Sequence, residues 1–379
     1  MGDLSDGASP GDSQLRRSPL HDRHVALGAK TAPFGGWEMP LEYAGGGVLK
    51  EHSAVREAVG VFDVSHLGTL RVRGRGARAH VDSCLTNSLD RIGPGQAQYT
   101  LACDEATGGV VDDLIAYLVS DDDLLLVPNA ANAAEVARRL RAAAPDGIEV
   151  VDLHEQEAIL AVQGPRCDEV LAALGLPVAH PYMSFESGAV GDVRVVVCRT
   201  GYTGERGYEL VLPSEGAPRV WDQLLELGAP YGIRPCGLGA RDTLRTEMGY
   251  PLHGHELSLD ISPVKARVVW AVGWDKPAFW GREVLVAERA AKAGPLLRGL
   301  KALGRGIPRP GMQVTGSDEG DGALGTVTSG TFSPTLRSGI GLALLDRSVV
   351  DGDVVVVEMR GRQEAFTVIK PPFVETSIR

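Results

Sequence analysis

The chain has 379 residues, enough for two or three domains because a single hydrophobic core rarely grows that large. Hydrophobic residues make up 44% and charged residues 23%, and no uncharged apolar run reaches the roughly 20 residues that cross a bilayer. The 38 basic and 49 acidic residues give a net charge of −11, which argues against a nucleic-acid partner. We therefore expect a multidomain, soluble, cytoplasmic protein that does not bind membranes.

The N-terminal segment does not read as a targeting sequence. Residues 1–18 carry Asp3, Asp6 and Asp12 among glycines and serines, which fits neither an apolar secretory signal nor an acid-poor transit peptide. We predict a short disordered extension over residues 1–18. The five cysteines of the chain are widely spaced and include no Cys-x-x-Cys pair, so we expect reduced, mostly buried thiols.

The first half of the chain shows a helix pair and then a run of short strands. Hydrophobic spacing predicts helices over Pro19–Leu27 and Val48–Val59. The glycines and proline of Phe34–Pro40, between them, predict an irregular loop. Four β-like runs follow, and the last leads into a helix over Ala133–Ala143. These runs are Thr69–Val72, Gln98–Ala102, Val110–Leu118 and Leu124–Val127.

The same order of strands and then helices returns after residue 157, which indicates two similar halves. The β-like runs are Ala158–Val162, Val193–Arg199 and Tyr208–Leu212, and the helical stretches are Arg219–Leu227 and Gly239–Met248. We predict an α+β body over residues 19–285. Beyond Glu283, turn residues separate short β-branched runs such as Val354–Val357 and Phe366–Ile369. Residues 290–379 should therefore form a small all-β barrel or sandwich.

A predicted hairpin carries the strongest chemical signal. Its strands are Gln98–Ala102 and Gly108–Ile115, and the second contains Asp112 and Asp113. Adjacent side chains of a strand point to opposite faces, so these two cannot both face one pocket. A carboxylate inside an apolar strand is costly unless it is paired, which favours a functional role for the inward one. The spacing does not say which one is inward, and two acids that cap a turn would fit equally well.

Two glycine-containing segments are weaker signals. Arg199–Leu210 has three glycines around an aromatic residue, which would let the backbone approach a ligand, yet an ordinary hairpin turn is the simpler interpretation. It matches neither the P-loop nor the dinucleotide fingerprint. In Gly237–Arg245 a helix follows the glycines and places Arg241 and Arg245 on one face. Such a pair suits a carboxylate ligand, although a solvated pair neutralised by nearby acids fits as well.

Other kinds of site lack support in the sequence. His253 and His255 flank Gly254 without a neighbouring carboxylate pattern, and no histidine spacing is typical of a metal site. No Gly-x-Ser-x-Gly segment occurs, so nothing indicates a nucleophile elbow. We predict an enzyme without a bound metal.

In their order, these segments resemble the glycine cleavage T protein and its folate-dependent relatives, from about Pro19 to Thr376. Seven motifs in register carry the resemblance. They are Phe34–Pro40, Phe62–His66, Gly108–Ile115, Val162–Pro165, Gly201–Glu205, Gly237–Asp242 and Thr328–Pro334.

The resemblance implies a folate-binding α+β body of two similar lobes around a central pocket, with a C-terminal antiparallel β-barrel. It implies an aminomethyltransferase that moves an aminomethyl group from the lipoyl arm of H protein to tetrahydrofolate, without metal or flavin. The products would be methylenetetrahydrofolate and ammonia. Matched motif by motif, the implied site residues are Asp112 as catalytic acid, Tyr99 and Asn129 as pocket lining, Tyr202 and Glu209 as pterin contacts, and Arg241 as the folate-binding arginine.

Two other functions stay open on the same scaffold. One is a folate-dependent demethylase of a small methylated substrate, which would need a closed pocket. The other is a non-catalytic folate-binding factor of iron–sulfur assembly, whose relatives lack the Gly-Gly-x-x-Asp-Asp pattern and depend on a cysteine motif absent here. Lys265 and Arg267 depart from the family pattern, which points to an altered surface or pocket wall.

Overall fold

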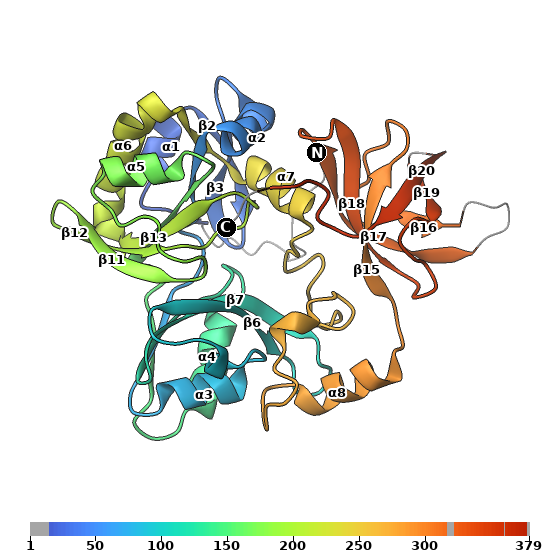
Figure 1. The fold of residues 1–379 in the computed structure, drawn as a ribbon, viewed down its shortest axis with the longest axis horizontal. Helices are drawn as coiled ribbons and strands as arrows, with labels where there is room; N and C mark the ends of the chain where they lie inside the picture. The colour runs from blue at the N-terminus through green and yellow to red at the C-terminus, as the bar shows by residue number, and fades with distance from the viewer. Residues whose placement is uncertain (1–14, 317–321, 360, 377–379) are drawn as a thin grey trace.

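The computed structural model describes residues 15–316, 322–359 and 361–376. Two lobes of sheet and helix make up the body, and a β-barrel stands beside them (Figure 1). The predicted fold class, an α+β body with a C-terminal antiparallel barrel, is confirmed. Within the described residues, no helix combines the length and the apolar character needed to span a membrane.

The N-terminal elements form a small three-stranded sheet. They are β1 (Arg16–Arg17), α1 (His21–Ala26), β2 (Ala29–Phe34), β3 (Trp37–Tyr43) and the helix α2 (Gly47–Glu57). The irregular loop predicted over Phe34–Pro40 is wrong, because β2 and β3 form a hairpin there. Gly35 and Gly36 have φ of +54° and +83°, and a two-residue turn with positive φ at both positions matches the twist of paired strands.

Part of the predicted N-terminal extension is ordered. Arg16–Arg17 pairs in parallel with β3, so these two residues belong to the sheet. Residues 1–14 lie outside the described residues.

The lower lobe in Figure 1 is a five-stranded sheet of order β6-β7-β8-β5-β9 with two helices packed on it. Its elements are β5 (Leu70–Arg73), α3 (Ala77–Cys84), β6 (Gln96–Cys103), β7 (Val110–Ser120), β8 (Asp123–Val127), α4 (Ala133–Ala143) and β9 (Glu149–Asp152). Helix α4 has the bounds that the sequence predicts. Its apolar face, with Val136 and Leu140, is fully buried in the core of this lobe.

The upper lobe is built on a six-stranded sheet of order β11-β12-β13-β10-β4-β14. The strands are β4 (Val59–Asp63), β10 (Glu157–Gln163), β11 (Phe185–Val190), β12 (Val193–Cys198), β13 (Gly207–Pro213) and β14 (Ile233–Cys236). The helices are α5 (Cys167–Ala173), α6 (Ala217–Gly228) and α7 (Leu238–Met248). Trp221 of α6 is fully buried in the core of this lobe. All five cysteines of the protein are buried and free, as predicted.

The C-terminal strands close into a barrel in which every neighbouring pair is antiparallel. Helix α8 (Arg282–Ala291) precedes it. The strands are β15 (Leu296–Ala302), β16 (Gln313–Thr315), β17 (Ala323–Ser333), β18 (Ser338–Leu345), β19 (Val354–Met359) and β20 (Arg362–Ile369). Closure leaves no strand edge unpaired, and this is how so small a β domain protects its backbone.

A buried carboxylate joins α7 to the barrel. Glu247 accepts hydrogen bonds from Ser333 at 2.5 Å and from the Thr335 hydroxyl at 3.0 Å. Ser333 is the last residue of the barrel strand β17, and Thr335 lies just beyond it. It also pairs with Arg56 of α2 at 2.8 Å. Helix α7 is therefore fixed on both sides, and α7 carries residues of the site described next.

Candidate functional site

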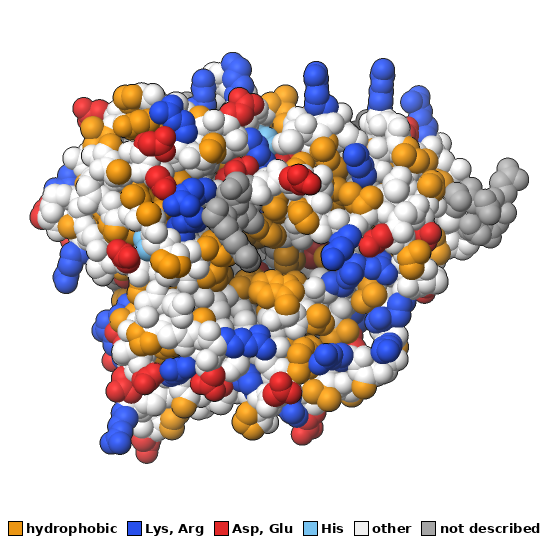
Figure 2. All heavy atoms as spheres, in the orientation of Figure 1, with side chains coloured by type: hydrophobic (Ala, Val, Ile, Leu, Met, Phe, Trp, Pro, Cys, Tyr) orange, Lys and Arg blue, Asp and Glu red, His pale blue; other side chains and the backbone are white. Residues whose placement is uncertain are grey.

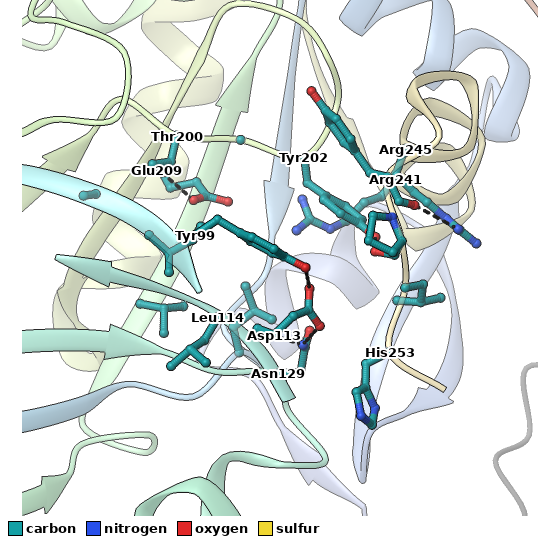
Figure 3. A pocket seen from close by; sticks show the side chains of 18 of the residues that line it. Tyr99, Asp113, Leu114, Asn129, Thr200, Tyr202, Glu209, Arg241, Arg245 and His253 are labelled. Carbon is teal, nitrogen blue, oxygen red and sulfur yellow. Dashed lines mark hydrogen bonds between the residues drawn. The ribbon is translucent and has the colours of Figure 1, made fainter. Parts of the chain in front are cut away.

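A cavity of about 450 Å³ lies between the two lobes and α7, within the size range of small-molecule sites. Figure 3 shows side chains of β6 and β7 on one side and those of β13, α7 and the loop after α7 on the other. Its lining includes the five predicted ligand-binding residues, Tyr99, Asn129, Tyr202, Glu209 and Arg241. The fold therefore gathers these five side chains into one chamber, although they come from positions as far apart as 99 and 241.

The cavity is open at one side. Trp270 and Tyr182 both line it, and they are 60% and 38% exposed. Hydrophobic side chains also gather near the middle of the molecular face in Figure 2, between lysines and arginines. A long or tethered ligand can therefore reach the interior from solvent.

The resemblance implied Asp112 as the catalytic acid, but the structure places its neighbour Asp113 at the cavity. Asp113 lines the cavity, whereas Asp112 is completely buried behind the wall. The expectation that Asp112 faces the ligand is therefore wrong. The alternation of side chains along β7 is as predicted, with Asp112 opposite Ala102 and Asp113 opposite Leu101 of β6. Strand alternation places the two side chains on opposite faces of the sheet. Only the packing of the sheet against the second lobe decides which of these faces lines the cavity.

Hydrogen-bond donors hold Asp113 in place. The Tyr99 hydroxyl donates to one carboxylate oxygen at 3.0 Å, and the Asn129 amide donates to the other at 2.9 Å (Figure 3). Asn129 also binds Asp112 through its backbone N–H and its side chain, each at 2.9 Å. Asn129 thus links the two acids, and the carboxylate that faces the cavity is held in one orientation.

Burial controls the charge of this pair. Burial and the neighbouring Asp113 charge raise the pKa of Asp112 to about 8. Burial also raises the pKa of Asp113, although the hydrogen bonds from Tyr99 and Asn129 oppose the rise. The two carboxyls therefore titrate together, above the ordinary range of aspartic acid.

A glycine makes room for the start of β7. A Cβ atom on Gly109 would lie 1.8 Å from the carbonyl oxygen of Leu259, so only glycine fits there. The following residue, Val110, donates its N–H to the Ser258 carbonyl at 2.7 Å. This close approach fastens the strand with the aspartates to the loop that follows α7.

Glu209 forms the opposite polar wall. It points toward the cavity in Figure 3 and accepts a hydrogen bond from the Thr200 hydroxyl at 2.6 Å. The buried Gln163 amide supports this wall from behind by donating to the carbonyls of Thr200 and Tyr208, at 3.2 and 3.3 Å. The glycine-containing loop of the sequence is therefore part of the site and not a simple turn.

Arg241 is a cation whose hydrogen-bonding capacity is not used up by the protein. Its guanidinium lies over the Tyr202 ring, 4.8 Å from the centroid, and its buried Nη1 has no hydrogen-bond partner among the described residues. Burial lowers the pKa of Arg241, while the Glu209 charge opposes this. Arg245, one turn later, differs because it pairs with Asp242 at 2.8 Å and Glu256 at 3.0 Å. Only Arg241 is therefore available to a ligand acceptor.

Sequence reasoning missed several lining residues. His66 Nδ1 and Gln98 Nε2 are buried, line the cavity and lack hydrogen-bond partners among the described residues. Burial and the Arg241 charge lower the pKa of His66 to about 3, so this ring is neutral. His66 belongs to the Phe62–His66 motif, which was a signal. Gln98 and Trp270 carried no such signal, because no local sequence pattern shows that a residue will line a cavity formed with distant segments.

Two other expectations concern residues outside this wall. Lys265 and Arg267 do not line the cavity, and the Lys265 ammonium donates to the Asp260 carbonyl at 3.0 Å. Among the residues that the structure describes, no three histidine, cysteine or acidic side chains are grouped as metal ligands. The chamber instead offers the carboxylates of Asp113 and Glu209, the guanidinium of Arg241 and several aromatic rings, which suit a flat ligand with polar edges.

Comparisons with known proteins agree with this architecture. The profile of the GCVT N-terminal domain matches residues 20–276, and that of the glycine cleavage T-protein C-terminal barrel domain matches residues 297–375. The aminomethyltransferase of Parafrankia sp. strain EAN1pec is 65% identical over 97% of this chain and 100% of its own length. That of Mycobacterium tuberculosis strain H37Rv is 58% identical over 97% and 99%.

A solved structure shows the same fold. The crystal structure of the glycine cleavage system aminomethyltransferase T from Bartonella henselae superimposes with a TM-score of 0.89 at 33% identity, covering 95% of this chain and 98% of that one. The chain therefore belongs to the glycine cleavage T-protein family, and its activity is that of an aminomethyltransferase of the glycine cleavage system.

Proposed function

We propose that the cavity binds tetrahydrofolate and that the aminomethyl group reaches it on the lipoyl arm of H protein. The observation that carries this proposal is Asp113, a carboxylate at the cavity surface whose two oxygens are held by Tyr99 and Asn129. A fixed anion beside a ligand nitrogen suits a reaction in which positive charge develops on carbon.

The polar walls suit the two sides of a pterin. Glu209 accepts from the amino and ring N–H donors of the pterin edge, and Tyr202 covers the ring face. The buried Nη1 of Arg241 donates to an acceptor on the same ring system. The spacing of Arg241 and Arg245 suited a carboxylate ligand. The Arg241 guanidinium, however, lies over the Tyr202 ring and interacts with the Glu209 charge, which favours a contact with the pterin ring.

In the transfer, two bonds form to the carried carbon and two break. The folate nitrogens attack that carbon, while its bonds to the amino nitrogen and to the lipoyl sulfur break. The two protons lost from the folate nitrogens end on ammonia and on the lipoyl thiol, so no oxidant or reductant is needed. Asp113 orients the attacking nitrogen and stabilises the iminium-like carbon as ammonia leaves. Asp112 stays behind the wall and acts through Asn129.

The open side of the cavity favours a tethered donor over a small free one. A demethylase of a small methylated compound would need a closed pocket, whereas Trp270 and Tyr182 line this cavity and are still partly exposed. We infer that the lipoyl arm enters past these two aromatic residues.

The test is release of ammonia and methylenetetrahydrofolate from aminomethylated H protein. Asp113→Asn and Asp112→Asn form a matched pair, because both replace a carboxylate by an amide of the same shape on adjacent residues. We expect Asp113→Asn to lose far more turnover than Asp112→Asn, with folate affinity retained in both. A larger loss in Asp112→Asn would return the catalytic role to that residue, and no folate-dependent ammonia release by wild type would refute the function.

A further inference from the structure

His253 belongs to no motif that we associated with function, yet it lines the cavity beside Asp113 (Figure 3). Its Nε2 lies 3.0 Å from the Val110 carbonyl oxygen, which can only accept a hydrogen bond. Nε2 therefore carries the proton. The other ring nitrogen, Nδ1, is left as an acceptor, and it lies 3.1 Å from the Asn132 amide nitrogen.

Asn132 then has a use for both of its amide hydrogens. One goes to His253 Nδ1, and the other goes to Asp112 Oδ1 at 2.8 Å. If the amide were flipped, its oxygen would face a carboxylate oxygen and a nitrogen lone pair at once. His253 and Asp112 therefore both favour this orientation of the Asn132 amide.

The same hydrogen-bond chain continues to the cavity surface. Asp112 receives three N–H donors, one from Asn132 and two from Asn129. Asn129 in turn reaches Asp113 Oδ1 at 2.9 Å. The path from His253 to Asp113 therefore crosses four contacts between side chains that are buried or half-buried.

We propose that His253 and Asn132 are positioning residues for aminomethyl transfer. His253 fixes the Asn132 amide through Nδ1, Asn132 holds Asp112, and Asp112 with Asn129 presents Asp113 to the ligand. This inference rests on the proposed function, because it concerns the residue that we place at the reacting nitrogen. The competing role for His253 is a direct contact with the ligand, since its ring also lines the cavity.

A double-mutant cycle separates these two roles. We expect His253→Ala and Asn132→Ala each to lower kcat about tenfold, as for loss of one buried hydrogen bond, with the KM for tetrahydrofolate within about twofold of wild type. If His253 acts through Asn132, the double variant should be no slower than either single one. A roughly hundredfold loss in the double variant would overturn the proposal, because it would mean that the two residues act independently.

Two conservative variants of His253 sharpen the cycle. In His253→Asn the side-chain oxygen can take the place of Nδ1 and accept from Asn132, whereas in His253→Gln the amide nitrogen can take the place of Nε2 and keep only the bond to Val110. Relative to His253→Ala, we expect His253→Asn to restore most of the lost kcat and His253→Gln to restore little of it. Rescue by Gln alone would contradict the proposal, since the bond to Asn132 would then be dispensable.

A spectroscopic readout does not depend on turnover. The ¹⁵N shifts of the His253 ring in the wild-type protein should show the neutral form with the proton on Nε2. A proton on Nδ1 would overturn the proposal even in an active enzyme. If wild type transfers no aminomethyl group, the proposed function fails, and the hydrogen-bond chain is then judged by these shifts.

Discussion

The two walls of the cavity differ in how their polar groups are satisfied. On the wall formed by β6 and β7, protein donors already bind both oxygens of Asp113. On the opposite side, Arg241 Nη1 and His66 Nδ1 are buried without a hydrogen-bond partner among the described residues. Unpaired buried polar atoms cost free energy, so this second set is retained for a ligand that completes it. In the function that we propose, one wall is organised for chemistry before the ligand arrives, and the other is completed by the ligand.

The largest effect is expected from a substitution in the wall formed by β6 and β7. Asp113→Asn should lower kcat about 100- to 1,000-fold, the scale of removing one charge-stabilising group from an active site. The KM for tetrahydrofolate should change by no more than a few-fold. Single-turnover kinetics with aminomethylated H protein would measure both, and a rate near that of wild type would remove Asp113 from the mechanism.

Breaking the second wall should act on affinity instead. Arg241→Ala removes a cation from a buried site, and we expect the Kd of tetrahydrofolate to rise about 10- to 100-fold, as for a lost charged hydrogen bond. The maximal rate at saturating folate should fall much less. Isothermal titration provides the test, with Arg289→Ala, which changes an exposed arginine of α8, as a surface control. An unchanged Kd would show that Arg241 does not bind folate.

A smaller effect is expected on the pH dependence of kcat, when Tyr99 of the first wall is changed. The rate should require ionised Asp113, and burial raises its pKa, so activity is lost as pH falls through a value above 3.8. The Tyr99 hydrogen bond lowers that pKa. In Tyr99→Phe the acid limb of the kcat profile should therefore move to higher pH, with a kcat loss of about tenfold or less. A limb displaced to lower pH would contradict the assignment of Tyr99 as a donor to Asp113.

The smallest effect on chemistry is expected outside both walls, at the contact between α7 and the barrel. Burial alone would raise the pKa of Glu247, but hydrogen bonds from His52 and Ser333 and the Arg56 charge lower it to about 2 from 4.5. Its stabilising contribution should be complete above pH 4.5 and should be lost as pH falls toward about 2.

Glu247→Gln tests this contribution. We expect about 2–3 kcal/mol lower stability at neutral pH, the scale of breaking a buried charged network, and a weaker dependence of Tm on pH between 4.5 and 2. The kcat at a temperature where the variant is folded should stay within about twofold. Equal loss of Tm at pH 2.5 and pH 7 would argue against an ionised Glu247.

The amino-acid sequence by itself determined most of the helices and strands and five of the residues that line the cavity. Hydrophobic periodicity gave α4 with its observed bounds, because a helix buries a stripe that repeats along the chain. The motif resemblance gave Tyr99, Asn129, Tyr202, Glu209 and Arg241, all of which line the cavity. Turn residues indicated a small closed β domain, since short strands must pair their edges.

Only the tertiary structure decided which sheet face lines the cavity and which distant residues come into contact. Strand alternation separated Asp112 from Asp113, but only the packing of two lobes showed that Asp113 faces the cavity. The bond between Asn132 and His253 joins residues 121 positions apart, and no local pattern could have predicted it. A local pattern records each residue's preference for burial or solvent, whereas a site arises where segments distant in sequence bring their polar side chains to the same point.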